Sequence, residues 1–272
     1  MNAHRTPRLL ALGTLGTVTT ALAVLGVEAV AAARREYVDP ESAPSVAGQF
    51  GDTAGREVRL VLLGDSTGAG VGVQAVGETV GGQLAQRLAR RGWRVHLAGV
   101  AVSGSRCRDL GPQVSRALLG RPDIAIICIG SNDALRGARL PAIRRSLGTA
   151  VERLTAAGVH TIVATCPDLG AARSFAQPLR AIASRRGRRV AAAEAAATTA
   201  AGGESIDLGR LTGPIFRADP GTLSPDEFHP SADGYRLWAE VLQPRVEAAA
   251  RRRSRSGSRD PGASDGGRPR RG

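Results

Sequence analysis

The sequence has no lysine, few aromatic residues and only three cysteines, and each shortage narrows what the protein can be. All 37 basic residues are arginine, and with 24 acids they give a formal net charge of +13. Most of the excess lies at the two ends, because residues 1–35 carry +3 and residues 251–272 carry +6, whereas the whole middle carries +4. Aromatic residues make up 3% of the chain, so few rings lie between the arginines, and specific nucleic-acid binding is not predicted.

Cysteine is scarce and odd in number. Cys107, Cys128 and Cys166 lie far apart, with no second thiol or histidine at the spacing of a metal ligand. The pattern indicates neither a disulfide framework nor a zinc site, and no metal or other cofactor is predicted. Cys128 lies inside an apolar run, so it is expected to be a small buried core residue.

The chain begins with one long apolar run. Residues 9–27 are 19 consecutive uncharged positions rich in leucine, valine and alanine, preceded by Arg5 and Arg8. The run is just long enough to cross a bilayer and longer than the usual apolar part of a signal peptide, while the alanines at 31–33 offer small residues at a cleavage site. We therefore expect residues 1–35 to be either a signal peptide or a membrane anchor. Either one predicts an exported protein, secreted or held in the cell envelope.

The remaining chain divides into three parts by composition. Residues 36–56 are rich in proline, glycine and small polar residues, which is typical of a linker. Residues 251–272 contain no large apolar side chain, so they are expected to be a disordered arginine-rich tail, either solvated or in contact with anionic lipid or envelope polymer. A single domain is predicted between them, over residues 57–250. The sequence does not indicate an oligomeric state.

Within this domain, short apolar runs alternate with stretches of helical period. Strands are predicted over residues 58–63, 93–98, 123–129, 160–165 and 205–208. Helices are predicted over residues 81–91, 114–119, 141–157, 174–200 with an interruption at Gly187, and 232–250 with Ser231 as the cap. The strand at 123–129 is almost continuously apolar, which is typical of a strand buried on both faces. The alternation predicts an α/β fold whose parallel strands all end at the same edge of the sheet, where such folds bind ligands.

Polar turns follow these strands. Ser66 lies in the turn Gly64-Asp65-Ser66-Thr67-Gly68 after the first strand, so its hydroxyl is a candidate nucleophile at the edge of the sheet. An activated serine needs a base within hydrogen-bond reach and a third group that fixes the tautomer of the base. His229, just before the last helix, can be that base, and Asp226 can reach its other ring nitrogen.

Two further turns supply donors for the negative charge that develops on an attacked carbonyl. Gly104 follows the second strand, and Asn132 follows the third. The backbone N–H groups of Ser66 and Gly104, with the side-chain amide of Asn132, can form an oxyanion hole.

These four blocks, in this order and spacing, resemble the SGNH (GDSL-type) hydrolase family of esterases and lipases. The family's serine, glycine, asparagine and histidine fall on Ser66, Gly104, Asn132 and His229, and its acid falls on Asp226. The resemblance covers roughly residues 58–246. It implies a flavodoxin-like, three-layer α/β/α sandwich with a parallel five-stranded sheet, and hydrolysis of esters or thioesters without a metal. One departure is visible, because the family usually has leucine at the position of Thr67.

Two other motif matches are rejected. Gly64-x-Ser66-x-Gly68 also fits the nucleophile elbow of α/β-hydrolases, but that elbow comes after several strands, and its acid and histidine are well separated. The glycines at 70 and 72 fit a dinucleotide fingerprint, but the second strand ends without the acid that would hold a ribose.

The sequence therefore predicts an exported serine hydrolase that cleaves carboxylic esters through an acyl-enzyme on Ser66. Its substrate is expected to be a small-molecule, lipid or glycan ester, such as an acyl lipid or an O-acyl or O-acetyl sugar of the envelope, with membrane association through residues 9–27. A thioesterase, and a catalytically idle envelope-binding domain of the same fold, are the alternatives.

Overall fold

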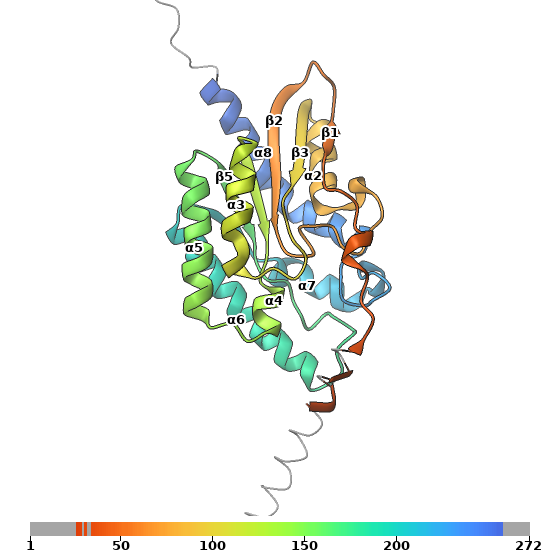
Figure 1. Ribbon diagram of the computed structural model, residues 1–272. Coiled ribbons are helices and arrows are strands. Elements are labelled where there is room, and N and C mark those ends of the chain that lie inside the picture. The colour runs from red at the N-terminus through yellow and green to blue at the C-terminus, as the bar shows by residue number, and fades with distance from the viewer. Residues whose placement is uncertain (1–25, 29, 32–33, 258–272) are drawn as a thin grey trace, which may run out of the picture.

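A six-stranded sheet in the order β1-β3-β2-β4-β5-β6 forms the middle layer of the protein (Figure 1). The computed structural model describes residues 26–28, 30–31 and 34–257. The strands are β1 (Gly48–Phe50), β2 (Arg56–Gly64), β3 (Trp93–Gly99), β4 (Ile124–Cys128), β5 (His160–Ala164) and β6 (Glu204–Ile206). Strands β2 to β6 pair in parallel, so their carboxyl ends meet at one edge. The predicted α/β fold with a parallel sheet is confirmed.

The sheet has one strand more than predicted. β1 lies inside the stretch predicted to be a linker, and it pairs antiparallel with β3 in the register Gly48↔Leu97 to Phe50↔Val95. Its neighbour Val46 is buried, and Phe50 packs against the core. A three-residue edge strand needs only backbone hydrogen bonds and one or two apolar contacts, so it leaves no periodic pattern in the sequence.

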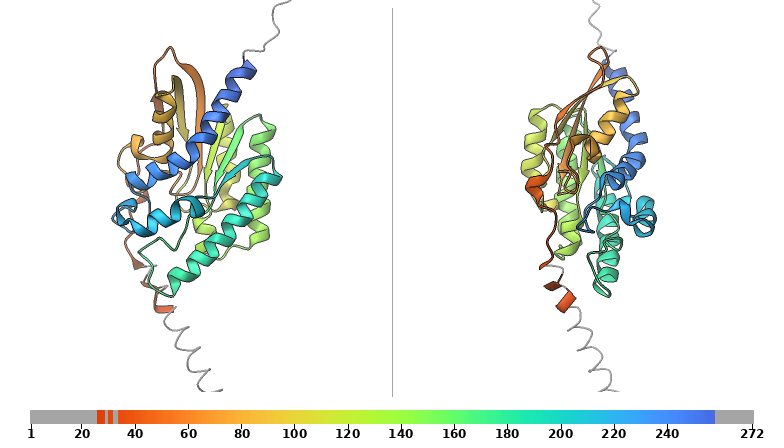
Figure 2. Two further views of the ribbon diagram at one scale, coloured as in Figure 1. Left: turned by 180° about the vertical axis from the view of Figure 1, so that it is seen from behind. Right: turned by 90° about the vertical axis from the view of Figure 1, so that its right-hand side faces the viewer.

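Helices cover both faces of the sheet (Figure 2). The helices are α2 (Val80–Ala89), α3 (Leu110–Leu119), α4 (Ser131–Leu135), α5 (Leu140–Ala156), α6 (Leu179–Ala200), α7 (Leu208–Ala218) and α8 (Ala232–Gly257). Side chains of α2, α7 and α8 form a buried cluster with one face of the sheet, and those of α3, α5 and α6 form a second cluster with the other face. β4 supplies Ile126 to the first cluster and Ile127 to the second, as expected for a strand buried on both faces.

Several helices differ from the prediction. α6 continues through Gly187, which is buried where a Cβ would lie 3.5 Å from the Leu169 side chain, so close packing compensates for the weak helix propensity of glycine. α8 begins after the Ser231 cap, whose hydroxyl accepts the Gly234 N–H at 3.3 Å, and it extends to Gly257. The first residues of the predicted tail are therefore helical.

The two ends of the chain lie mostly outside the described residues. This applies to all of the predicted membrane segment except Gly26 and Val27, to the alanines at 32 and 33, and to residues 258–272. No helix in the described part of the chain is long and apolar enough to cross a membrane.

Candidate active site

The turn that carries Ser66 starts where β2 meets β4. Gly64 has φ of +124°, and a Cβ there would lie 1.7 Å from the carbonyl oxygen of Cys128, so only glycine fits. The side chain of Gln113 holds both backbone groups of Gly64, accepting its N–H at 2.8 Å and donating to its carbonyl at 3.0 Å. Asp65 Oδ1 then accepts the N–H and the hydroxyl of Thr67 at 3.0 and 2.8 Å. These bonds fix the turn and present Ser66 at the edge of the sheet.

Thr67 stands where the family pattern has leucine, and its hydroxyl bonds with Asp65 while the residue also lines the active-site cavity. Burial raises the pKa of Asp65 to about 6 despite the two bonds from Thr67.

Ser66, His229 and Asp226 form one buried line of hydrogen bonds. His229 Nε2 lies 3.0 Å from Ser66 Oγ, and His229 Nδ1 lies 2.6 Å from Asp226 Oδ2. The three residues are 6–7% exposed. Because a carboxylate can only accept, Nδ1 carries the proton and Nε2 is free to accept the proton of the serine hydroxyl. This is the geometry by which a histidine activates a serine.

Asp226 is held mainly by its own turn. Its Oδ1 accepts the Ser224 hydroxyl at 2.8 Å and the N–H groups of Phe228 and His229 at 2.9 Å. Burial opposes ionisation of this carboxyl, but the hydrogen bonds from His229 and Phe228 outweigh it and hold the pKa of Asp226 well below its usual range. Asp226 therefore stays charged over the whole physiological pH range.

Donors for an oxyanion lie beside Ser66. Gly104, with φ of +80°, and Asn132, in the first turn of α4, line the same cavity as Ser66 and His229. Within the described part of the chain, the N–H groups of Ser66 and Gly104 donate to no protein acceptor. The structure thus brings all five predicted site residues to one place and leaves two backbone donors available there.

The cavity has a volume of about 630 Å³ and is lined mainly by apolar side chains. Large apolar ones come from α4, from the loop between β5 and α6, from the first residue of α6, and from the turn before α8. They include Leu135, Leu169, Phe175, Leu179 and Phe228.

A group of buried acids beneath the site is absent from the sequence prediction. Glu194, on α6, is fully buried, and its Oε2 accepts the Cys166 N–H at 2.7 Å. Burial raises the pKa of Glu194 to about 8, although the hydrogen bond from Cys166 lowers it. The nearby charges of Asp133 and Asp65 raise the pKa further. Asp133 is also buried and accepts the Cys107 N–H at 2.9 Å. A signal for Glu194 was present, because it is the one charged residue in an alanine-rich run.

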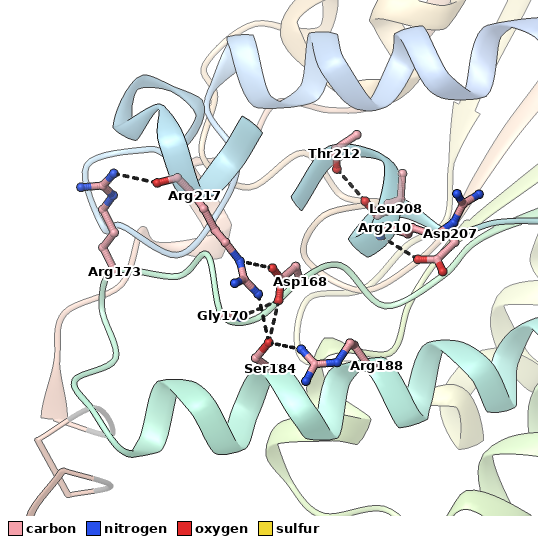
Figure 3. Close-up of polar contacts among 10 residues, drawn as sticks. All are labelled: Asp168, Gly170, Arg173, Ser184, Arg188, Asp207, Leu208, Arg210, Thr212 and Arg217. Carbon is pink, nitrogen blue, oxygen red and sulfur yellow. Dashed lines mark hydrogen bonds and ion pairs between the residues drawn. The ribbon is translucent and has the colours of Figure 1, made fainter. Parts of the chain in front are cut away.

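Another acid, Asp168, anchors the loop that follows β5 (Figure 3). Its carboxylate accepts the Ser184 hydroxyl at 2.9 Å, the Gly170 N–H at 3.0 Å and Arg217 Nε at 2.5 Å. Burial opposes ionisation, but the bonds from Arg217 and Ser184 outweigh it and lower the pKa of Asp168. The network ties the loop to α6 and α7 at the rim of the cavity.

No group of three or more histidine, cysteine, aspartate or glutamate side chains in the described residues is arranged to hold a metal ion. The three cysteines are free and buried.

A parallel sheet between two helical layers, with a serine, a histidine and an aspartate aligned at its carboxyl edge, defines the class of three-layer α/β serine hydrolases. Within that class, residues 62–237 match the profile of the GDSL-like lipase/acylhydrolase family, so the chain belongs to this family, and ester hydrolysis is the activity that membership implies.

Known relatives agree with this placement. A GDSL-like esterase of Mycobacterium tuberculosis is 42% identical over 192 residues, which are 68% of this chain and 60% of that protein. The chain thus matches less than two thirds of that relative's length.

Solved structures share the fold. A lipase/acylhydrolase from Enterococcus faecalis has a TM-score of 0.55 at 20% identity, covering 71% of this chain and 96% of its own. An acetylxylan esterase from Geobacillus stearothermophilus has a TM-score of 0.53 at 19% identity, and the match covers 72% of this chain and 96% of that esterase.

Proposed function

We propose that this protein hydrolyses carboxylic esters through an acyl-enzyme on Ser66. The observation that carries the proposal is the buried line from Ser66 Oγ through His229 to Asp226, with separations of 3.0 and 2.6 Å. His229 Nε2 takes the hydroxyl proton as Ser66 Oγ bonds to the acyl carbon, and it returns that proton to the alkoxide as the ester bond breaks. Water then attacks the acyl-enzyme, giving a proton to His229, and the acid leaves as Ser66 regains its hydrogen.

The oxyanion of each tetrahedral intermediate is stabilised by Ser66 N–H, Gly104 N–H and the side-chain amide of Asn132. The two N–H groups are suited to this role because they have no acceptor in the described part of the chain. Asn132 is suited because it lies on α4 at the cavity wall, two residues after the N-cap Gly130, whose φ is +113°.

An acyl chain is the favoured occupant of the cavity. A volume of about 630 Å³ is within the range of small-ligand sites, and the walls supplied by Phe175, Leu179 and Phe228 offer apolar surface instead of the hydrogen-bonding groups a sugar requires. We therefore favour an acyl lipid over an O-acetyl sugar as substrate. If residues 1–35 export the chain, as the sequence predicts, the enzyme meets such esters in the cell envelope.

The proposal is tested by labelling the full chain with a fluorophosphonate and assaying p-nitrophenyl esters of increasing acyl length. Ser66→Ala is expected to lose labelling and to reduce kcat by roughly 10⁴-fold or more, with the fold intact. Ser146→Ala, on α5 away from the cavity, is the matched control, and its labelling and kcat should equal those of the unmodified chain. Equal activity in Ser66→Ala would overturn the mechanism.

The same assay separates the alternatives. Failure of the folded chain to label would favour a binding domain without catalysis. A strong preference for an acyl thioester over the matching oxygen ester would favour a thioesterase.

A further inference from the structure

The segment just before the domain lies against the candidate catalytic residues. We call residues 35–40 the strap. Figure 1 shows this orange-red segment beside the light-blue loop that precedes α8. The N–H of Val38 donates to Asp226 Oδ2 at 3.1 Å, across 188 residues of sequence, and Arg35 forms an ion pair with Glu227.

Val38 supplies Asp226 Oδ2 with a hydrogen-bond donor that the turn before α8 does not provide. Apart from the imidazole, Asp226 receives three hydrogen bonds from its own turn, and all three reach Oδ1. The Val38 N–H instead reaches Oδ2, the oxygen that holds His229 Nδ1. We infer that the strap is part of the active site, with Val38 as a positioning residue for the Asp226–His229 pair and Tyr37 as a wall of the acyl cavity. This inference rests on the proposed hydrolysis.

Tyr37 places an aromatic ring beside the histidine. Its ring centroid lies 5.4 Å from that of Phe228 and 6.5 Å from that of His229, both in edge-on arrangements. Tyr37, Val38 and Pro40 all line the cavity that contains Ser66. The ring therefore both shields the imidazole from water and extends the apolar wall started by Phe228.

The strap also fastens a strained residue. Glu227, between the acid and Phe228, has φ of +58°, a conformation that side chains larger than glycine adopt at a cost. Its carbonyl accepts the N–H groups of Arg173 and Ser174 at 2.9 and 3.3 Å, while its carboxylate pairs with Arg35. Such a conformation persists where several contacts determine it, and one of these contacts comes from the strap.

Seven residues, 28–34, separate the strap from the N-terminal apolar run, and they include the alanines of the predicted cleavage site. A cut within the alanines at 31–33 would leave residues 35–40 attached to the domain. Both fates of the N-terminal segment, anchored or cleaved, therefore retain the contact with Asp226.

The first test removes one backbone donor from the full chain. Val38→Pro deletes the N–H to Asp226 Oδ2 and is expected to lower kcat/KM about tenfold. Because the carboxylate then interacts more strongly with a protonated imidazole, the acid limb of the kcat/KM profile should move to higher pH. Val38→Ala keeps the N–H and should keep the pH profile of the unmodified chain. Glu36→Pro introduces the same residue where the N–H donates no hydrogen bond within the described part of the chain, so it controls for a proline in the strap.

If Val38→Pro does not fold, variants of Tyr37 test the inference instead. Tyr37→Ala is expected to raise KM for long acyl esters severalfold more than for acetate, because the missing ring shortens the apolar wall. Tyr37→Phe keeps the ring and should restore the chain-length preference.

The results separate this inference from the proposed function. If the unmodified chain hydrolyses esters and depends on Ser66, but Val38→Pro lowers activity without moving the pH profile and Tyr37→Ala affects all esters equally, the strap has only a structural role and the inference is wrong. If the unmodified chain has no Ser66-dependent activity, the proposed function itself fails.

Discussion

The burial of Glu194 predicts how the free energy of unfolding depends on pH. A fully buried acid keeps a proton that the same acid releases in the unfolded chain. Its pKa is raised to about 8 by burial, from 4.5 for an unperturbed glutamate. The free energy of unfolding contributed by this group is therefore highest below about pH 4.5, falls as the pH rises, and levels off above about pH 8. At about 1.4 kcal/mol per pH unit, the loss between about pH 5 and about pH 8 is roughly 4 kcal/mol.

Glu194→Gln removes the titration and keeps an oxygen for the Cys166 N–H. We expect the variant to gain stability relative to the unmodified chain as the pH rises, by roughly 4 kcal/mol between about pH 5 and about pH 8. Asp65 also has a raised pKa, about 6, from burial, and it gives both chains a decline of the same sign in a lower pH window. The comparison between the two chains is therefore more informative than either curve alone.

The measurement is urea unfolding at several pH values, with equal m-values required for both chains. A difference in the free energy of unfolding that stays constant across this pH range would refute the argument, because it would show that Glu194 titrates alike in the folded and unfolded states.

Three other predictions follow from the site. Asn132→Ala should lower kcat about 100-fold with KM nearly unchanged, measured by ester turnover, whereas an equal rise in KM would argue against an oxyanion role. Gly130→Ala places a Cβ 2.2 Å from Glu194 Oε1 at φ of +113°, so we expect the free energy of unfolding to fall by about 2 kcal/mol and activity to fall with it as the Asn132 turn shifts. Asp168→Ala should cost about 2 kcal/mol in urea unfolding, because it leaves buried donors unpaired, while Arg217→Ala, whose side chain is 52% exposed, should cost less.

The sequence predicted the parts of the site that follow strands. Ser66, Gly104 and Asn132 each lie just after an apolar run, so the rule that parallel strands end at one edge was enough to bring them together. His229 and Asp226 were found because a short turn places an acid within reach of an imidazole.

The missed parts have a different physical origin. The contribution of Val38 is a backbone N–H, which every residue except proline has, so no residue type marks it. β1 is too short to show a period, and α6 continues through Gly187 because tertiary packing outweighs local propensity. Glu194 is different, because a single acid in an alanine-rich helix is visible in the sequence. Such a residue can be expected to accept a buried hydrogen bond, as Glu194 does from the Cys166 N–H.

One arrangement recurs at this end of the sheet: side-chain carboxyl groups accept backbone N–H groups and so hold the loops in place. The acids that do this are Asp65, Asp133, Asp168, Glu194 and Asp226. Where the acid also has a charged or imidazole partner, as Asp226 and Asp168 do, its pKa is lowered and the contact stabilises the fold at neutral pH. Where it lacks one, as with Glu194, the pKa is raised and the same contact costs stability as the pH rises. Glu194 accepts the Cys166 N–H and packs against Gly130, where a Cβ would lie 2.2 Å from its Oε1, so this cost in folding free energy arises beside the glycine that precedes Asn132. Glu194→Gln should therefore be more stable than the unmodified chain at alkaline pH. Any accompanying fall in kcat would measure how much the placement of Asn132 depends on the buried acid.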